Sequence, residues 1–266
     1  MAKIEDQRIV IDCTCEVQLQ QTIIDAVYLA LKLEKEICFF GNYLNNSEKE
    51  KLQQRTAFYA NFVKKDIPSL PVSVLLLEGK LNNLVKDLGE KYNTILYCYS
   101  GAMDNRLLEA FYRSGFPFYF SKKKTSKGNQ FSKVLIPVDF RNSSKDSALW
   151  GSYLGRFCNA EIKLLVASEK NTEDRDLVAS NTESISRLFT QFSFPWSSDF
   201  GKSSSWGIHE EAVKNEEPFD VIIFSGSLNV TLVDKITGTF EKRLVNQSEK
   251  SVLLINPQRE LYLICS

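Results

Sequence analysis

Short apolar runs alternate with amphipathic stretches along the chain, and the clearest example begins at Val134. Val134–Val138 is apolar and rich in β-branched residues, which predicts a buried strand that ends at Asp139. Polar residues suited to cap a helix follow at Asn142–Ser144, and residues 148–157 then place apolar side chains at helical spacing. Residues 162–166 predict a second strand. This order indicates a βαβ unit with parallel strands, in which ligands bind beyond the carboxyl end of a strand, where Asp139 lies.

The same pattern occurs near the start of the chain. Residues 8–13 predict a strand with Asp12 near its end, residues 17–33 an amphipathic helix, and residues 37–40 a second strand. The two βαβ units are separated by about the length of one small domain, so the repeat indicates two tandem halves.

The remaining segments continue the alternation of helices and strands. In the first half we expect helices at 47–65, 81–88 and 104–114, and strands at 72–77, 94–99 and 116–120. In the second half we expect helices at 171–192, 209–215 and 230–245, strands at 206–208, 220–224 and 252–255, an irregular segment at 193–205, and an added edge strand at 261–265. Five strands alternating with helices in each half predict an α/β fold of two tandem doubly wound, five-stranded parallel sheets.

A polar, basic segment at 122–130 separates the halves. It contains glycine and no apolar residue, which favours a solvated linker over a phosphate or lipid contact. We therefore predict domains at 1–124 and 129–266 joined by a linker at 125–128.

Composition excludes several classes of partner. Lysine plus arginine and aspartate plus glutamate number 33 each, so the net charge is zero and broad capture of nucleic acid or an anionic membrane is not expected. No apolar run is long enough to span a bilayer, and the first ten residues carry no apolar signal core. The six cysteines lack metal-like spacing, which favours reduced thiols and a cytoplasmic location.

Three segments of the second half carry a recognisable sequence pattern. Pro137–Phe140 ends a strand with Pro-Val-Asp-Phe, the next helix carries Ser144 and Ser147-Ala148-Leu149, and Asn159–Leu165 reads Asn-Ala-Glu-Ile-x-Leu-Leu. Together they resemble the opening of a universal stress protein domain. The similarity covers residues 133–166 and returns at 220–257. It implies a tandem stress-response protein with ATP or AMP as the candidate ligand.

The candidate phosphate loop departs from the family pattern. In nucleotide-binding members the fourth strand is followed by Gly-x2-Gly-x9-Gly-Ser/Thr, whose backbone N–H groups can approach phosphate. When the motif is anchored on the final Gly-Thr pair, Ser225 and Leu228 stand in place of the first two glycines. The resemblance implies adenine or ribose contacts from Pro137, Val138 and Asp139, and a phosphate path lined by Ser225, Ser227, Gly238 and Thr239.

No catalytic constellation is evident in the sequence, so we expect no enzyme activity. His209 is the only histidine, and we expect it on the surface at the start of a helix. In the first half Asp12 has no phosphate loop to accompany it, because no Gly-Ser/Thr pair follows the strand at 94–99. That half is therefore interpreted as a structural partner.

Two functions remain open on the sequence alone. One is a regulatory protein that binds ATP or AMP weakly in the second half. The other is a nucleotide-free module that contacts an unidentified protein, for which the aromatic residues at 194–196 and Trp206 are candidate contacts. The resemblance also implies a pseudo-two-fold pairing of the halves through the strands at 116–120 and 252–255, and leaves further homodimerisation open.

Overall fold

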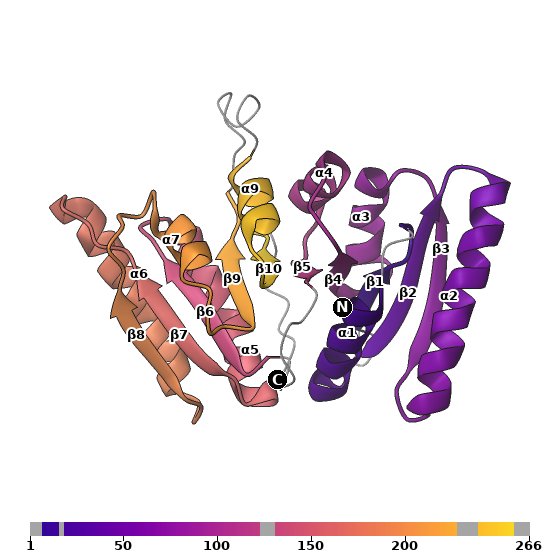
Figure 1. The fold of residues 1–266 in the computed structure, drawn as a ribbon, viewed down its shortest axis with the longest axis horizontal. Coiled ribbons are helices and arrows are strands. Elements are labelled where there is room, and N and C mark those ends of the chain that lie inside the picture. The colour runs from indigo at the N-terminus through magenta and orange to yellow at the C-terminus, as the bar shows by residue number, and fades with distance from the viewer. Residues whose placement is uncertain (1–6, 16–18, 123–130, 228–238, 258–266) are drawn as a thin grey trace. The chain divides into compact units, whose positions relative to one another are not determined.

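The computed structural model describes residues 7–15, 19–122, 131–227 and 239–257 (Figure 1). These residues form two compact units, of which unit 1 extends to Lys122 and unit 2 is described from Phe131 to Pro257. The predicted linker and the tail at 261–265 lie outside the described residues.

Unit 1 alternates strands with helices from its first strand to its last. Its elements are β1 (Arg8–Asp12), α1 (Gln20–Leu33), β2 (Glu36–Tyr43), α2 (Asn46–Asp66), β3 (Val72–Glu78), α3 (Leu81–Glu90), β4 (Thr94–Ser100), α4 (Asn105–Arg113) and β5 (Phe118–Ser121). The strands are ordered β3-β2-β1-β4-β5, and every pairing described within this unit is parallel.

Unit 2 has the same order of elements. They are β6 (Lys133–Val138), the 3-10 helix η2 (Asn142–Asp146), α5 (Ser147–Cys158), β7 (Glu161–Val166), α6 (Thr172–Thr190), β8 (Trp196–Phe200), α7 (Ile208–Lys214), β9 (Val221–Ser225), α9 (Phe240–Gln247) and β10 (Ser251–Ile255). The strand order β8-β7-β6-β9-β10 repeats that of unit 1, again with parallel pairs. The predicted fold of two doubly wound, five-stranded sheets is thus confirmed.

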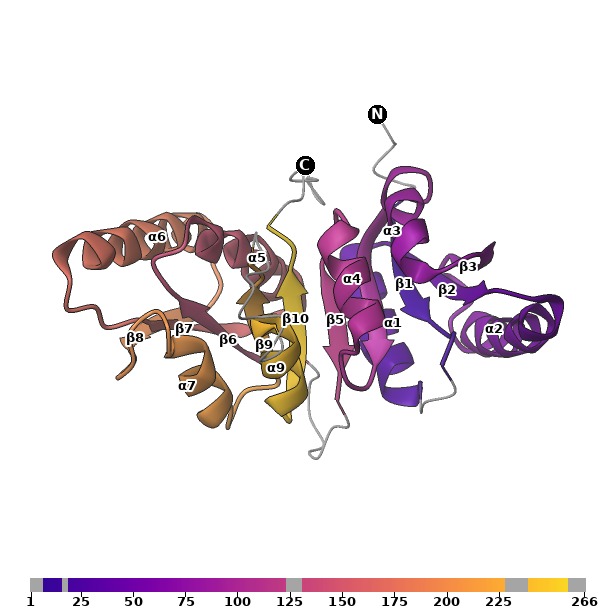
Figure 2. The same ribbon diagram turned by 90° about the horizontal axis from the view of Figure 1, so that it is seen from above.

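Helices cover both faces of the sheet in unit 2. Figure 2 shows α5 and α6 on one face and α7 and α9 on the other. The central strands are therefore buried on both sides, which explains why their sequences are nearly continuous apolar runs. This arrangement leaves the carboxyl ends of β6 and β9 as the place where polar side chains can gather.

Two glycines let α5 approach the core of unit 2 closely. A Cβ atom at Gly155 would lie 2.5 Å from Cδ2 of Phe194, and one at Gly151 would lie 2.7 Å from Cδ1 of Ile136. Phe194 is 9% exposed and packs edge-on against Phe189. The glycines therefore leave the space that these apolar side chains fill.

The third strand of unit 2 was placed wrongly by the sequence pattern. The prediction was a strand at 206–208, but β8 occupies Trp196–Phe200, inside the segment expected to be irregular, and Trp206 lies in a turn. β8 pairs with β7 on one side only among the described residues, and four of its five residues are exposed. A strand that is mostly exposed does not need a run of apolar residues. The sequence of β8 therefore resembles that of a loop.

Candidate functional site

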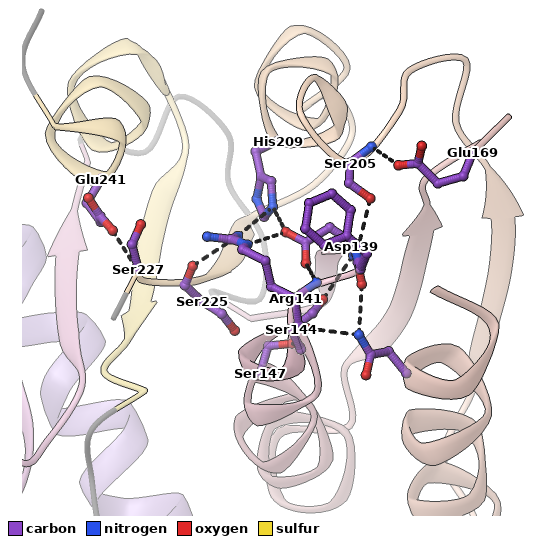
Figure 3. A network of polar contacts seen from close by, with 12 residues as sticks. Asp139, Arg141, Ser144, Ser147, Glu169, Ser205, His209, Ser225, Ser227 and Glu241 are labelled. Carbon is purple, nitrogen blue, oxygen red and sulfur yellow. Dashed lines mark hydrogen bonds and ion pairs between the residues drawn. The ribbon is translucent and has the colours of Figure 1, made fainter. Parts of the chain in front are cut away.

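Asp139 follows β6 directly and is only 1% exposed. Its Oδ1 accepts the backbone N–H of Arg141 at 2.8 Å, which forms a tight turn, and its own backbone N–H donates to Oγ of Ser144 at 3.0 Å (Figure 3). Asp139 therefore lies at the carboxyl edge of the sheet, where the strand pattern predicted it, with its backbone and carboxylate both held by the turn.

The second carboxylate oxygen of Asp139 is held by two side chains. Oδ2 lies 2.7 Å from Nε of Arg141 and 2.7 Å from Nε2 of His209 on α7. Nη2 of Arg141 also lies 3.5 Å from the carbonyl oxygen of Ser225 at the end of β9. The three side chains form one buried cluster, which we call the Asp139 cluster.

Hydrogen bonds from neighbouring elements fix the turn beneath this cluster. The side-chain amide of Asn181 on α6 donates to the carbonyl oxygens of Asp139 and Arg141, each at 2.9 Å. Oγ of Ser205 accepts the N–H of Phe140 at 3.1 Å. The position of the Asp139 carboxylate is thus fixed from several sides, so a ligand could reach it only by displacing protein contacts.

Nε2 of His209 faces both other members of the cluster. It lies 2.7 Å from Oδ2 of Asp139 and 2.9 Å from Nη2 of Arg141, which can only donate. A proton on Nε2 would donate to the carboxylate, whereas a lone pair there would accept from Arg141, so the two contacts call for opposite tautomers of the neutral ring. The other ring nitrogen, Nδ1, is buried and has no hydrogen-bond partner among the described residues.

The surroundings of His209 and Asp139 lower the pKa values of both side chains. Burial lowers the pKa of His209 below 6.5, and the Arg141 charge lowers it further; the hydrogen bond to Asp139 and the charges of Asp139 and Glu241 only partly offset this. Burial alone would raise the pKa of Asp139, but the His209 hydrogen bond and the Arg141 charge outweigh it and hold that pKa below 3.8. At neutral pH the cluster therefore consists of a carboxylate, a guanidinium and a neutral imidazole.

Unit 2 should lose stability as the pH falls below about 6.5. In that range the unfolded chain takes up a proton on His209 that the buried ring resists, so the free energy of unfolding falls, with a limiting slope of about 1.4 kcal/mol per pH unit. Asp139 adds a further loss only below about pH 3.9, as the pH falls toward its lowered folded pKa. Denaturant titrations followed by tryptophan fluorescence measure this in unit 2, because Trp150, Trp196 and Trp206 are the chain's only tryptophans.

The matched control for this pH dependence is His209→Gln. His209 is the only histidine in the chain, so the difference between the two stability curves isolates its proton. Equal slopes for the wild-type chain and the variant between pH 5 and pH 7 would contradict the assignment of a buried neutral imidazole.

A carboxylate of the protein contacts one of the residues predicted to line the phosphate path. The backbone N–H of Ser227 donates to Oε1 of Glu241 at 2.6 Å, and Glu241 is 2% exposed. Thr239 caps α9 by accepting the N–H of Lys242 through its side chain, and Ser225 ends β9 with its Oγ buried. The described part of the predicted phosphate path therefore includes a buried acidic side chain. Gly238 and Leu228 lie outside the described residues.

The other predicted contact residues belong to the core of the sheet. Pro137 and Val138 are buried within β6, in register with Leu165 and Val166 of β7. The structure thus brings Asp139 and Ser225 together through Arg141, and links Ser227 to the α9 turn that begins at Thr239. Contacts of these residues with adenine, ribose or phosphate stay a prediction.

Unit 1 has a similar turn with a buried aspartate, which pairs with an arginine from another element. Asp12 is 1% exposed, and its Oδ1 accepts the N–H of Thr14 at 2.8 Å, as Asp139 does with Arg141. Its Oδ2 lies 3.5 Å from Nη1 of Arg106, which comes from α4 and not from the turn itself. Both units therefore hold a buried acid at the end of the first strand and neutralise it with an arginine.

Sequence reasoning missed the residues that surround Asp139. The expectation of a surface histidine was wrong, because His209 is 2% exposed. Its partner lies 70 positions earlier in the chain, so no local pattern could reveal the contact. Arg141 could have been predicted from the sequence, because an arginine two residues after an aspartate at a strand end can donate a hydrogen bond to its carboxylate. Glu241 carried no such signal, because the sequence predicted a helix at 230–245 and Glu241 lies near the end of that range, whereas α9 begins at Phe240.

Aromatic residues on this side of unit 2 differ in their exposure. Trp206 is 81% exposed and packs edge-on against Phe140, with ring centroids 5.5 Å apart, and Phe200 at the end of β8 is 79% exposed. Phe194 is buried, whereas Trp196 is half-buried against Phe189. Of the aromatic residues proposed as partner contacts, Trp206 is thus the one whose side chain lies open to solvent.

The described residues offer neither a metal centre nor a membrane span. No group of three or more histidine, cysteine, aspartate or glutamate side chains within them is arranged to hold a metal ion. None of the helices they form combines the length and apolar character needed to cross a bilayer.

Comparison with known proteins identifies the fold. A universal stress protein from Archaeoglobus fulgidus DSM 4304 is 11% identical, with 95% of this chain and 97% of that chain covered and a TM-score of 0.68. A putative universal stress protein from Pseudomonas aeruginosa UCBPP-PA14 is 12% identical, with coverages of 95% and 93% and a TM-score of 0.63. No family model and no curated protein sequence matches the chain.

A third similar structure extends the comparison beyond stress proteins. It is the cytoplasmic domain of a prokaryotic cation chloride cotransporter, which is 11% identical, with 96% of this chain and 97% of that chain covered and a TM-score of 0.63. The chain therefore has the fold of universal stress proteins, and the resemblance seen in the sequence is confirmed at the level of the fold.

Proposed function

We propose that this protein is a non-enzymatic regulatory module that has the universal stress protein fold and works through protein contacts, without a resident nucleotide. The fold alone does not determine the ligand, because similar folds are found in a stress protein and in a cotransporter domain. The proposal rests on the side chains that occupy the nucleotide-binding positions. The observation that carries it is the contact between Glu241 and the N–H of Ser227.

The Glu241 contact opposes phosphate binding in two ways. Glu241 already accepts the backbone N–H of Ser227, which a phosphate oxygen would otherwise accept. Its carboxylate also places a buried negative charge beside the predicted phosphate path. Two like charges about 4 Å apart repel by about 4 kcal/mol at an effective dielectric constant of about 20. A charge-assisted hydrogen bond returns only about 1.5–3 kcal/mol, so the repulsion outweighs one such bond. A phosphate group at the N–H of Ser227 is therefore disfavoured by the described residues on this side.

The adenosine side is similarly occupied. Asp139 already accepts hydrogen bonds from the backbone and side chain of Arg141 and from His209, and almost none of its surface is exposed. A ribose hydroxyl could bind there only by breaking one of these contacts. The Asp139 cluster thus supports a structural role for residues that the family resemblance would assign to a ligand.

Trp206 is the most exposed large apolar side chain in the described residues, and it suits a protein contact. Tryptophan is frequent among the residues that dominate binding energy in interfaces, and Phe140 supports its ring from one side. We infer that the surface around Trp206 and Phe200 contacts the regulated partner. This assignment does not require a bound nucleotide.

Calorimetric titration of the chain with ATP·Mg tests the proposal. We expect no saturable heat at millimolar ATP, and the same result with AMP. A dissociation constant below about 1 mM, which corresponds to about −4 kcal/mol, would overturn the proposal and restore the nucleotide-binding alternative. The chain's three tryptophans, all in unit 2, give an independent fluorescence readout of the same titration.

A further inference from the structure

We propose that the free edge of β3 in unit 1 is a self-association surface, which pairs with β3 of a second copy of this chain in antiparallel orientation. This inference is independent of the proposed function, because it concerns a different unit from the Asp139 cluster.

β3 presents unpaired backbone groups along one side. Within the described residues it pairs with β2 alone, from Val72 to Glu78. The carbonyl of Pro71 accepts from Ile37 and the N–H of Gly79 donates to Tyr43, each at 2.9 Å. Backbone groups point to alternate sides along a strand, so those of the odd-numbered residues face β2. The N–H and C=O groups of Val72, Val74 and Leu76 consequently point away from the sheet.

The sequence of β3 has few of the usual protections of an edge strand. It reads VSVLLLE, in which Glu78 at the end is the only charged residue and proline is absent, and the side chain of Val74 is 41% exposed. Natural edge strands are commonly protected by such charges, prolines or bulges, because an apolar free edge recruits another strand. A seven-residue edge of this composition therefore favours strand addition.

Unit 2 offers an internal comparison at the same topological position. Its outer strand β8 reads WSSDF, and Asp199 within it forms an ion pair with Lys163 of β7 at 2.7 Å. Both strands are the outermost on the β3 or β8 side of their sheets, but five of the seven residues of β3 are apolar, against two of the five in β8. The apolar edge is thus a specific property of β3 and not a consequence of the fold.

The charges on and near β3 favour a second copy of the chain as its partner, paired in antiparallel orientation. Glu78 is the only charged residue of β3, and antiparallel pairing places the two copies of Glu78 at opposite ends of the new ladder. Each would then lie near the start of the other β3. That start follows the last turn of α2, which carries Lys64 and Lys65 beside the terminal Asp66. The pairing is isologous, so every contact occurs twice and the assembly closes as a dimer.

Sedimentation velocity over a range of concentrations tests the pairing. We expect the wild-type chain to shift toward twice its mass of 30.4 kDa. Val74→Lys should weaken dimerisation by at least about tenfold, because it places a charge in the new ladder. Val74→Pro should do the same by removing an outward N–H that β2 does not use. The matched control is Leu177→Lys on α6, which alters an apolar side chain of similar exposure, 47%, and should leave dimerisation unchanged.

Hydrogen exchange and a charge swap locate the interface. The amides of Val74 and Leu76 should be protected in the dimer and exchange faster in Val74→Lys, while the amides of β1 stay protected and report an intact fold. Glu78→Lys should weaken the dimer, and combining it with Lys64→Glu should restore it. A chain that stays monomeric up to about 100 μM, well above a typical micromolar affinity, would overturn the proposal. So would a dimer that tolerates Val74→Lys, or a charge swap that restores nothing.

Discussion

Asp139→Ala is expected to destabilise unit 2 by about 3 kcal/mol. Removing one partner of a buried ion pair typically costs about 3–5 kcal/mol, because the remaining charge is left buried without compensation. We expect the lower end of this range, since the side chain of Arg141 is 26% exposed and water can solvate part of its charge. His209 would lose its acceptor as well, and the ring is almost fully buried.

Denaturant unfolding followed by tryptophan fluorescence measures this loss in unit 2. The matched control is Asp199→Ala, which removes a side chain that is 64% exposed and paired with Lys163. Exposed ion pairs contribute about 0–1 kcal/mol, so the control should lose no more than that. Equal losses for the two variants would show that the Asp139 cluster has no special role in stability.

Gly155→Val is expected to destabilise the same unit by about 3 kcal/mol. Three ring atoms of Phe194 lie within 2.7 Å of the position that a Cβ atom would occupy, so both α5 and the ring would have to move. Overpacking a well-filled core typically costs about 1–3 kcal/mol, and a branched side chain at so close an approach should reach the upper end.

The control for Gly155→Val is Ser180→Val on the exposed face of α6. It introduces the same branched side chain into a helix without a core contact, so the expected change stays within about 0.5 kcal/mol. If Gly155→Val were as mild as this control, the close packing of α5 on Phe194 would not be needed for stability.

The fold could be predicted from the sequence because the hydrophobic pattern of each element is local, and because the order of elements repeats in the two halves. Apolar runs such as Val134–Val138 and the helical spacing at 148–157 specify elements without reference to distant residues. The strand β8 was missed because most of its residues are exposed, so tertiary pairing with β7 determines its structure. Element type was thus predictable wherever burial imposed a pattern.

The candidate site was predictable only in part, for a physical reason. Asp139 was found because a strand end fixes its position. His209 and Glu241 were not, because their contacts join residues 70 and 14 positions apart. The loss of glycine at position 225 was visible in the sequence, but the carboxylate that occupies the phosphate side was not. The structure adds one observation to this departure from the family motif, the contact of the Glu241 carboxylate with the backbone N–H of Ser227.

The most direct test of this explanation is calorimetric titration with ATP·Mg of three chains that differ stepwise. They are the wild-type chain, the double variant Ser225→Gly with Leu228→Gly, and the triple variant that adds Glu241→Ala, each checked for folding by tryptophan fluorescence. Our proposal is that the Glu241 carboxylate opposes phosphate binding even when the loop glycines are restored, so saturable binding is expected only for the triple variant. Equal ATP binding by the double and triple variants, or binding by the wild-type chain, would contradict the account.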